Sequence, residues 1–200
     1  MKLYLSPGAC SLADHIALHE AGIEFDRVYV DLKAKRTDDG RDFTTINPKG
    51  YVPALEFDNG HVLTENIAIL TVASRKAPQL VPEGEHGDIR LLEMLAFIST
   101  EIHKAFKPFF GGGSDAEKAK AGEALAKRFG YLAERLKGDF LFGDRFTVAD
   151  AYLFVMLTWA KANGLPLPEP LPAYFERVKA RPAVREALDH EKQEPAQRAA

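Results

Sequence analysis

Short apolar runs separated by turn-forming residues characterise the first third of the chain. The runs Leu3–Leu5 and Arg27–Asp31 each predict a strand, and the amphipathic stretch 11–21 between them predicts a helix that Gly22 ends. A strand, a helix and a second strand in this order favour parallel pairing of the two strands.

A hairpin is predicted farther along the same part of the chain. The runs 53–57 and 61–63 flank Asp58-Asn59-Gly60, and Asn-Gly readily adopts the positive φ angles that a tight turn requires. A helix predicted over 67–74 follows the hairpin. Residues 1–76 are therefore expected to form a small α/β domain with a mixed sheet.

The pattern changes to helical spacing in the rest of the chain. Prolines and glycines at 77–87 indicate a linker, and no strand pattern is found over 88–200. The second part is therefore predicted to be an all-helical domain. Its first apolar stripe at helical spacing consists of Leu91, Leu92, Leu95, Ile98, Ile102 and Phe106.

Capping sequences locate the later helices. Ser114-Asp115-Ala116-Glu117 is a capping box, and Thr147-Val148-Ala149-Asp150 resembles a second box with Asp in the role of Glu. The helix that the second box begins is expected to end at Asn163-Gly164. The remaining predicted elements are helices over 172–180 and 182–189 and a polar, frayed tail from Glu191 to Ala200.

Composition and charge narrow the class of protein. The 200 residues are 46% hydrophobic and 28% charged, with a net charge of −3. Basic and acidic residues are interspersed, which argues against a nucleic-acid partner, and no apolar run is long enough to span a membrane. A single cysteine excludes an internal disulfide framework and favours a reducing, cytoplasmic location.

Cys10 is the first candidate for chemistry. It stands where the first strand gives way to the first helix, and the unpaired N–H groups of a helix start favour thiolate over thiol. The sequence therefore predicts a lowered pKa for this cysteine. The alternative is a small, buried and inert core residue.

The segments around Pro53 and Glu65 are candidates for binding. A cis Val52–Pro53 bond would turn the N–H and C=O of Val52 outward, toward an extended peptide. Glu65 and Asn66 at a helix start suit the free end of an amino acid: the acid takes the ammonium, and helix N–H groups take the carboxylate. The alternative for Glu65 is a favourable acid in a first helical turn.

Histidines offer less specific signals. His103 is expected to be packed or hydrogen-bonded, although imidazole can share a proton with a thiol or a polar ligand near neutral pH. His15 and His19 share a helix face, but no third ligand is evident, so the pair predicts a solvated or hydrogen-bonded face and no metal site. Trp159, Phe106, Phe109 and Phe110 are predicted to be core, although the phenylalanines also suit a pocket lining.

Together, these motifs resemble the bacterial beta-class glutathione transferases from Met1 to about Leu188. The cysteine within its flanking sequence separates this class from transferases that use Tyr or Ser. The carrying segments are Gly8–Leu12, Val30–Lys35, Asn47–Leu55, Leu63–Asn66, Thr100–Phe106 and Phe146–Tyr152.

The resemblance implies a thioredoxin-like N-terminal domain, an all-helical C-terminal domain and a cis bond before Pro53. It implies that Cys10 lies beside the glutathione sulfur and that His103 assists it. It also implies that Thr147 and Asp150 cap a helix rather than perform chemistry. The glutathione site would consist of Lys35, Tyr51, Val52, Pro53, Glu65, Asn66, Thr100, Glu101 and His103.

The function implied is conjugation of glutathione, as a substrate rather than a cofactor, to a hydrophobic electrophile. Thiol–disulfide exchange or peroxide reduction through Cys10 is a second possible chemistry. A non-catalytic ligand carrier and a glutathione-dependent dehalogenase or isomerase are the alternatives. The family implies a homodimer, but Ala96 stands where the family often has an asparagine that reaches the partner's glutathione.

Overall fold

A computed structural model describes residues 1–198 of the protein, with side chains described as far as Lys192. The chain forms two compact units. One comprises Met1–Pro78 together with the segment from Arg181 onward, and the other comprises Gln79–Ala180. The sequence pattern predicts domains of residues 1–76 and 88–200 and so places the C-terminal helix in the second domain. In the structure, that helix packs with the first unit instead.

The first unit is built on a five-stranded sheet with the strand order β3-β2-β1-β4-β5. Strand β1 (Lys2–Leu5) pairs parallel with β2 (Asp26–Asp31) and antiparallel with β4 (Ala54–Glu56). Strand β5 (Val62–Thr64) completes the predicted hairpin with β4, and β3 (Arg36–Thr37) pairs antiparallel with β2. The parallel pair and the hairpin are confirmed, whereas the two-residue β3 carries too little pattern to be predicted.

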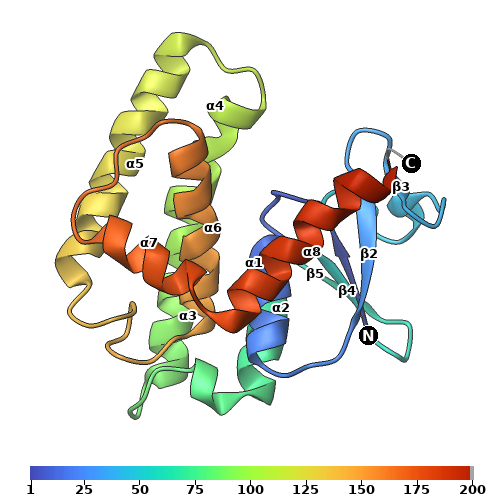
Figure 1. The fold of residues 1–200 in the computed structure, drawn as a ribbon, viewed down its shortest axis with the longest axis horizontal. Helices are drawn as coiled ribbons and strands as arrows, with labels where there is room; N and C mark the ends of the chain where they lie inside the picture. The colour runs from blue at the N-terminus through green and yellow to red at the C-terminus, as the bar shows by residue number, and fades with distance from the viewer. Residues whose placement is uncertain (199–200) are drawn as a thin grey trace. The chain divides into compact units, whose positions relative to one another are not determined.

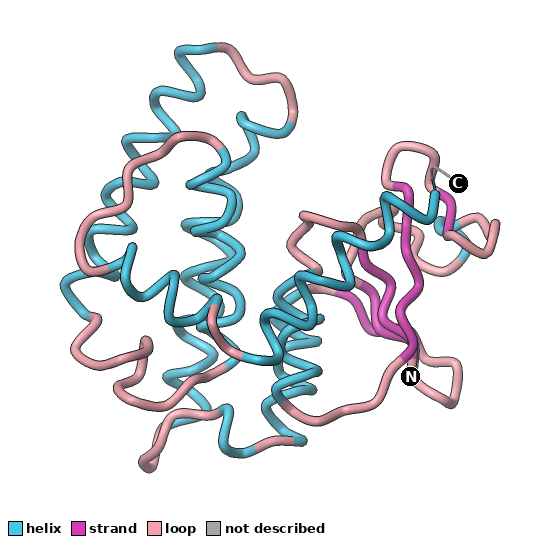
Figure 2. The backbone as a smooth tube through the Cα atoms, viewed as in Figure 1, coloured by secondary structure: helices cyan, strands magenta, loops and turns pink. Residues whose placement is uncertain are grey.

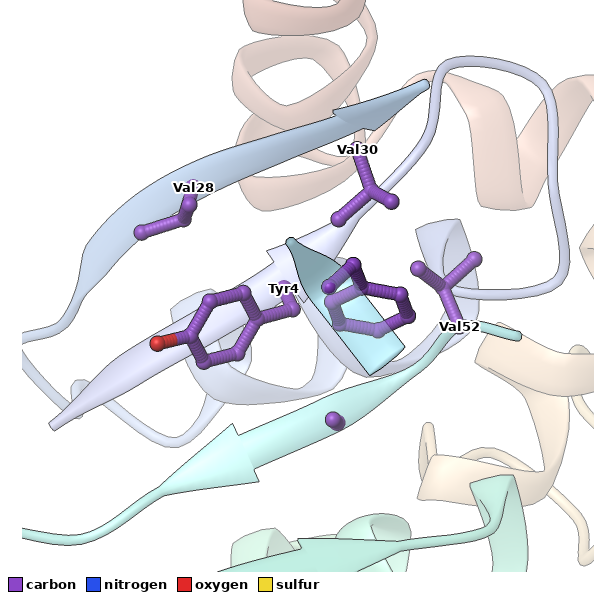
Figure 3. Close-up of a cluster of buried hydrophobic side chains, with 6 residues drawn as sticks. Tyr4, Val28, Val30 and Val52 are labelled. Carbon is purple, nitrogen blue, oxygen red and sulfur yellow. The ribbon is translucent and has the colours of Figure 1, made fainter. Parts of the chain in front are cut away.

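Side chains alternate between the two faces of this sheet, as the period of a strand requires. Tyr4 lies opposite Val28 on one side and Ala54 on the other. Phe43 of the short 3₁₀ turn η1 (Phe43–Thr45) belongs to the cluster on the same face. Figure 3 shows the labelled members of this cluster, which are Tyr4, Val28, Val30 and Val52.

Three helices belong to the first unit: α1 (Leu12–Glu20), α2 (Asn66–Lys76) and α8 (Pro182–Arg198). Helix α1 packs against both α2 and α8 (Figure 1). The prediction that the chain frays from Glu191 is wrong, because α8 continues to Arg198 and the Glu191 side chain is buried. Burial against the first unit overrides the weak polar pattern of this segment.

The second unit is helical throughout its described elements (Figure 2). Helix α6 is its centre, because every residue from Val148 to Leu157 is buried. No helix within residues 1–198 is both long and apolar enough to cross a membrane. The second unit begins within the 3₁₀ turn η2 (Pro78–Leu80). The elements of this unit after that turn are α3 (Gly87–Phe97), η3 (Ile98–Ile102), η4 (His103–Phe106), α4 (Lys107–Phe110), α5 (Asp115–Arg135), α6 (Val148–Ala162) and α7 (Leu171–Lys179).

The apolar stripe that begins this unit is not one regular helix. After α3 the chain makes a π turn (η3) and then a 3₁₀ turn (η4) before α4. The predicted stripe is buried except for Leu92, which is 48% exposed. A π turn inserts an extra residue into the helical spacing, and such turns often occur at functional sites.

Both predicted capping boxes are present. The box of α6 is buried, and its Asp150 carboxylate accepts hydrogen bonds from the N–H and the hydroxyl of Thr147, both at 2.8 Å. It also accepts one from the Leu141 N–H and one from the Tyr174 hydroxyl, each at 2.9 Å. One side chain therefore joins the start of α6 to the preceding loop and to α7.

We expect Asp150→Ala to lower the free energy of unfolding by roughly 3 kcal/mol or more, because it leaves several buried donors unpaired. Urea unfolding followed by circular dichroism measures the loss. Glu117→Ala is the matched control, since it removes the equivalent acid from the exposed capping box of α5. Equal losses in the two variants would contradict the structural role assigned to Asp150.

Candidate active site

Cys10 lies in the turn between β1 and α1. The turn is closed by a hydrogen bond from the Ala9 N–H to the Ser6 carbonyl (3.0 Å), and α1 begins two residues after the cysteine. The thiol donates toward the carbonyl of Val52, with 3.5 Å between sulfur and oxygen. The single cysteine is therefore held against the segment that precedes β4.

The electrostatic environment of Cys10 differs from the one predicted. Burial raises the pKa of the thiol to about 12, and the nearby Asp14 carboxyl raises it as well. The expected lowering is wrong because desolvation outweighs the attraction of the helix-start N–H groups. Cys10 is consequently a protonated hydrogen-bond donor at neutral pH.

Asn66 connects the cysteine turn to helix α2. Its side-chain amide donates to the Cys10 carbonyl oxygen at 2.9 Å and to the Asp14 carboxylate at 2.7 Å. Asp14 is completely buried, and burial raises the pKa of its carboxyl well above its usual range. Asn66 therefore positions the beginnings of α1 and α2. The sequence signal for this link is Asp14, a charged residue within an otherwise apolar helix face.

Val52 and Glu65 lie at the same end of the sheet as Cys10. Ala54 pairs with Thr64 in the β4–β5 hairpin and with Tyr4 in β1. Val52, two residues before β4, Glu65, directly after β5, and the turn after β1 therefore lie at one end of the sheet. The Val52–Pro53 bond is cis, as the resemblance implied. Among the described residues, the Val52 N–H has no hydrogen-bond partner.

Glu65 has an unusual backbone conformation, with φ of 82° at the position that precedes α2. A positive φ in a non-glycine residue costs free energy and is commonest at functional sites. Its carboxylate accepts hydrogen bonds from the Tyr51 hydroxyl at 2.7 Å and the Lys49 ammonium at 2.5 Å. Lys49 was not among the predicted residues. Lys35 donates to the Gly50 carbonyl at 2.6 Å, close to the same segment.

His103 belongs to the second unit. Its Nδ1 lies 2.7 Å from the Tyr152 hydroxyl, and the ring stands edge-on to Trp159, which is buried as predicted. Burial lowers the pKa of His103 to about 4, with a further contribution from Lys104, so the imidazole is neutral near pH 7. From the sequence, Tyr152 stands out only as the end of the segment Phe146–Tyr152 and not as a partner of His103.

A cavity of about 580 Å³ adjoins His103. Phe110 lines it and is 58% exposed, so the core assignment of this phenylalanine is wrong, whereas Phe106 is fully buried. Phe110 packs edge-on against Trp159 at 4.7 Å between ring centroids. Lys104, Lys107 and Gly111 complete the lining.

Thr100 and Glu101, two further predicted site residues, lie in the π turn before His103. The Thr100 hydroxyl donates to the Ala96 carbonyl at 2.9 Å, and Glu101 pairs with Arg128 at 2.6 Å. The predicted residues of the first unit thus lie around one end of the sheet, and those of the second unit lie in or beside the π turn.

Comparison with known proteins identifies the family. A model of the glutathione S-transferase N-terminal domain matches residues 9–76, and a model of the glutathione S-transferase C-terminal domain matches residues 96–182. The chain belongs to the glutathione S-transferase family. The predicted thioredoxin-like and helical domains are those of this family.

Individual relatives support the assignment over nearly the whole chain. The transferase is 43% identical to glutathione S-transferase GstA of Escherichia coli O157:H7, covering 96% of this chain and 98% of that protein. A sphingomonad glutathione S-transferase solved with glutathione is 45% identical, with a TM-score of 0.88 and coverage of 96% and 99%. The beta-class enzyme of Sphingomonas chungbukensis is 44% identical, with a TM-score of 0.87 and coverage of 96% and 98%. The resemblance to the bacterial beta class is confirmed.

We expect alkylation of Cys10 in the ligand-free transferase to accelerate with pH without levelling off between pH 7 and 10, because a pKa of about 12 leaves the thiolate a minor form throughout. Iodoacetamide labelling followed by mass spectrometry measures the rate. N-acetylcysteine is the control and should level off above its ordinary pKa of about 8.5. A plateau below pH 8 for the protein would show that the helix start, not burial, dominates.

Proposed function

We propose that the protein is a glutathione transferase that joins the sulfur of glutathione to an electrophilic carbon of a hydrophobic second substrate. The observation that carries the proposal is that Cys10, Val52 and Glu65 lie at the same end of the sheet in the first unit. The relatives with the same fold, including one solved with glutathione, support it.

The residues at this end of the sheet suit three polar parts of glutathione, which are its peptide backbone, its α-ammonium and its α-carboxylate. Val52 offers a backbone N–H to an extended peptide, in the manner of an added strand. Glu65 offers a carboxylate to the α-ammonium of the γ-glutamyl group, and the N–H groups at the start of α2 suit its α-carboxylate. We include Lys35, Tyr51, Pro53 and Asn66 in this site. Thr100, Glu101 and His103 stay predictions, because their assignment to glutathione rests on the family resemblance alone.

Conjugation is the chemistry that the Cys10 environment favours. A protonated thiol can donate a hydrogen bond to the glutathione sulfur and thereby stabilise its thiolate, which is the nucleophile. Disulfide exchange instead requires Cys10 itself as a thiolate. In that second chemistry, the Cys10 thiolate attacks oxidised glutathione, releases one glutathione thiolate, and is itself freed when a further glutathione attacks the mixed disulfide.

The second substrate is proposed to bind in the cavity beside His103. Phe110 is an exposed aromatic side chain backed by Trp159, and aromatic surfaces bind apolar or aromatic electrophiles. Lys104 and Lys107 give the same cavity a positive rim. The electrophile is therefore expected to be aromatic, with electron-withdrawing or anionic substituents.

The homodimer and the cytoplasmic location remain parts of this proposal. The exposed Leu92 and Ile89 of α3 offer apolar surface for a second copy. Ala96 supplies no polar side chain for a contact with the partner's glutathione, so the interface is expected to be less polar than is usual in the family.

Glu65→Ala should weaken glutathione binding by about 2 kcal/mol, or roughly 30-fold, because it removes the acceptor of the substrate ammonium. Isothermal titration calorimetry measures the change. Tyr51→Phe is the matched control: it removes one hydrogen bond to Glu65 but keeps the carboxylate, and should cost much less. Unchanged affinity in Glu65→Ala would remove Glu65 from the site, and no glutathione binding by the wild type up to ~10 mM would refute the proposed function.

Cys10→Ala is expected to keep measurable conjugation of glutathione to a generic aryl halide, since glutathione carries its own nucleophile. The same variant should lose every glutathione adduct formed with oxidised glutathione, because the chain has no other cysteine. Intact-protein mass spectrometry and a conjugation assay measure the two outcomes. A wild type that forms no adduct at alkaline pH while iodoacetamide labels it would exclude the exchange chemistry.

A further inference from the structure

Three histidines of the first unit meet where α1 and α8 pack together. His15 and His19 come from α1, and His190 comes from α8. One ring nitrogen from each lies within 4.8 Å of the other two, and the ring centroids are 5.0 to 5.5 Å apart. The third ligand that the sequence did not reveal is thus supplied by the C-terminal helix.

The closest pair already has the spacing of a metal site. His190 Nδ1 lies 3.4 Å from His15 Nε2. Two nitrogens that bind one tetrahedral zinc ion at about 2.0–2.1 Å are separated by roughly 3.3–3.4 Å. Stacked imidazoles at this spacing share no strong hydrogen bond, and the distance between their nitrogens already matches that of two ligands of one zinc ion.

Carboxylates face the opposite edges of two of the rings. Glu191 Oε1 lies 3.9 Å from His15 Nδ1, and Glu186 Oε1 lies 3.8 Å from His19 Nδ1. Histidine ligands of metals commonly donate their second N–H to a carboxylate, which fixes the tautomer and orients the other nitrogen. At 3.8 and 3.9 Å the acids are too far away for a hydrogen bond, but they face Nδ1 of each ring, which leaves the Nε2 atoms of His15 and His19 for a ligand.

Several of these polar atoms lack hydrogen-bond partners despite being buried. The proposed ligand atom His19 Nε2 is buried and has no hydrogen-bond partner within the described residues. The same holds for His15 Nδ1 and Glu191 Oε1, whose separation of 3.9 Å is too long for a hydrogen bond. His15 is fully buried, so of the two predicted alternatives, a solvated or a hydrogen-bonded face, the solvated one does not hold for this residue. Buried unpaired polar groups in a native protein call for a ligand, a water or an ion.

The two helices are held together independently of the histidines. Arg181 makes a bidentate pair with Glu20, at 2.6 and 2.8 Å, which ties the start of α8 to the end of α1. The Tyr29 hydroxyl donates to the His190 carbonyl at 3.3 Å. The helices that carry the three ligands are thereby held together before a metal arrives, so binding requires adjustment of side chains rather than docking of a helix.

We propose that His15 Nε2, His19 Nε2 and His190 Nδ1 bind one divalent zinc ion, with solvent in the fourth position. Zinc suits three neutral imidazoles in a tetrahedral arrangement better than magnesium or calcium, which require oxygen ligands. The ion would join α8 to α1, and this inference does not depend on the proposed transferase function.

Charges around the cluster are mixed but compatible with the ion. Burial lowers the pKa of all three imidazoles, to about 3 for His15 and about 4 for His19, so the rings are neutral ligands at pH 7. Arg27 opposes a cation, whereas Glu186 attracts one. Burial raises the pKa of Glu191 to about 7, so this carboxyl attracts a cation only in its ionised form. Phe25 packs edge-on against His15 and His19 and shields them from solvent.

Metal titration of untagged, chelator-treated protein tests the proposal. We expect one Co²⁺ per chain with the intense visible absorption of a tetrahedral site, and its displacement by one equivalent of Zn²⁺. Thermal unfolding should shift upward by about 5–10 °C when free Zn²⁺ exceeds its dissociation constant 100-fold. No stoichiometric binding, or octahedral Co²⁺ spectra alone, would overturn the proposal.

Matched variants locate the ion. His190→Gln should weaken Zn²⁺ binding at least 100-fold, while His61→Gln, which removes an exposed imidazole in the β4–β5 hairpin, should leave it unchanged. If metal-free His190→Gln does not fold, His19→Gln provides the same comparison. Zn²⁺ affinity that survives His190→Gln, or that disappears in Cys10→Ala, would place the ion elsewhere and refute the site.

Discussion

The buried hydrogen bonds of Asn66 fix the part of the first unit on which the candidate site depends. A single amide joins the carbonyl of Cys10 to the carboxylate of Asp14 and so ties the starts of α1 and α2 together. Because Asp14 is fully buried, losing this donor would leave a polar group without compensation. The Asn66 side chain therefore couples the position of the cysteine turn to that of Glu65, although the side chains of Cys10 and Glu65 take no part in these hydrogen bonds.

Desolvation then decides the chemical character of the site. The same burial that makes the Asp14–Asn66 contact strong raises the pKa of both Asp14 and Cys10. In the second unit, burial has the opposite effect on the pKa of His103, because the charged form there is the protonated one. Cys10, Asp14 and His103 are consequently biased toward their neutral forms. The charged side chains of the candidate site in the first unit are Glu65 and Lys49, which are exposed, and Lys35, which is half-buried.

The sequence predicts elements that have a local cause. The hairpin follows from Asn59-Gly60, the cap of α6 from Thr147 and Asp150, and the parallel pair from a strand–helix–strand order. Features that depend on distant packing could not be read in this way. The sign of the Cys10 pKa shift, the exposure of Leu92 and Phe110, and the partners of Glu65 all depend on neighbours far along the chain. Motif resemblance located site residues, but their protonation required the structure.

Helix α8 shows most clearly how packing overrides local sequence. Its polar composition indicates a frayed end, yet Glu191 is buried and accepts a hydrogen bond from the Gly8 N–H at 2.8 Å. Gly8 belongs to the turn that carries Cys10 and has a φ of 74°, which favours glycine, so the turn and the helix are specified together. Glu191 also faces His15, and the C-terminal helix thus contacts both the histidine cluster and the cysteine turn. The last helix of the chain is, in its contacts, part of the N-terminal domain, and the conformation of the cysteine turn is stabilised by residues more than 180 positions away.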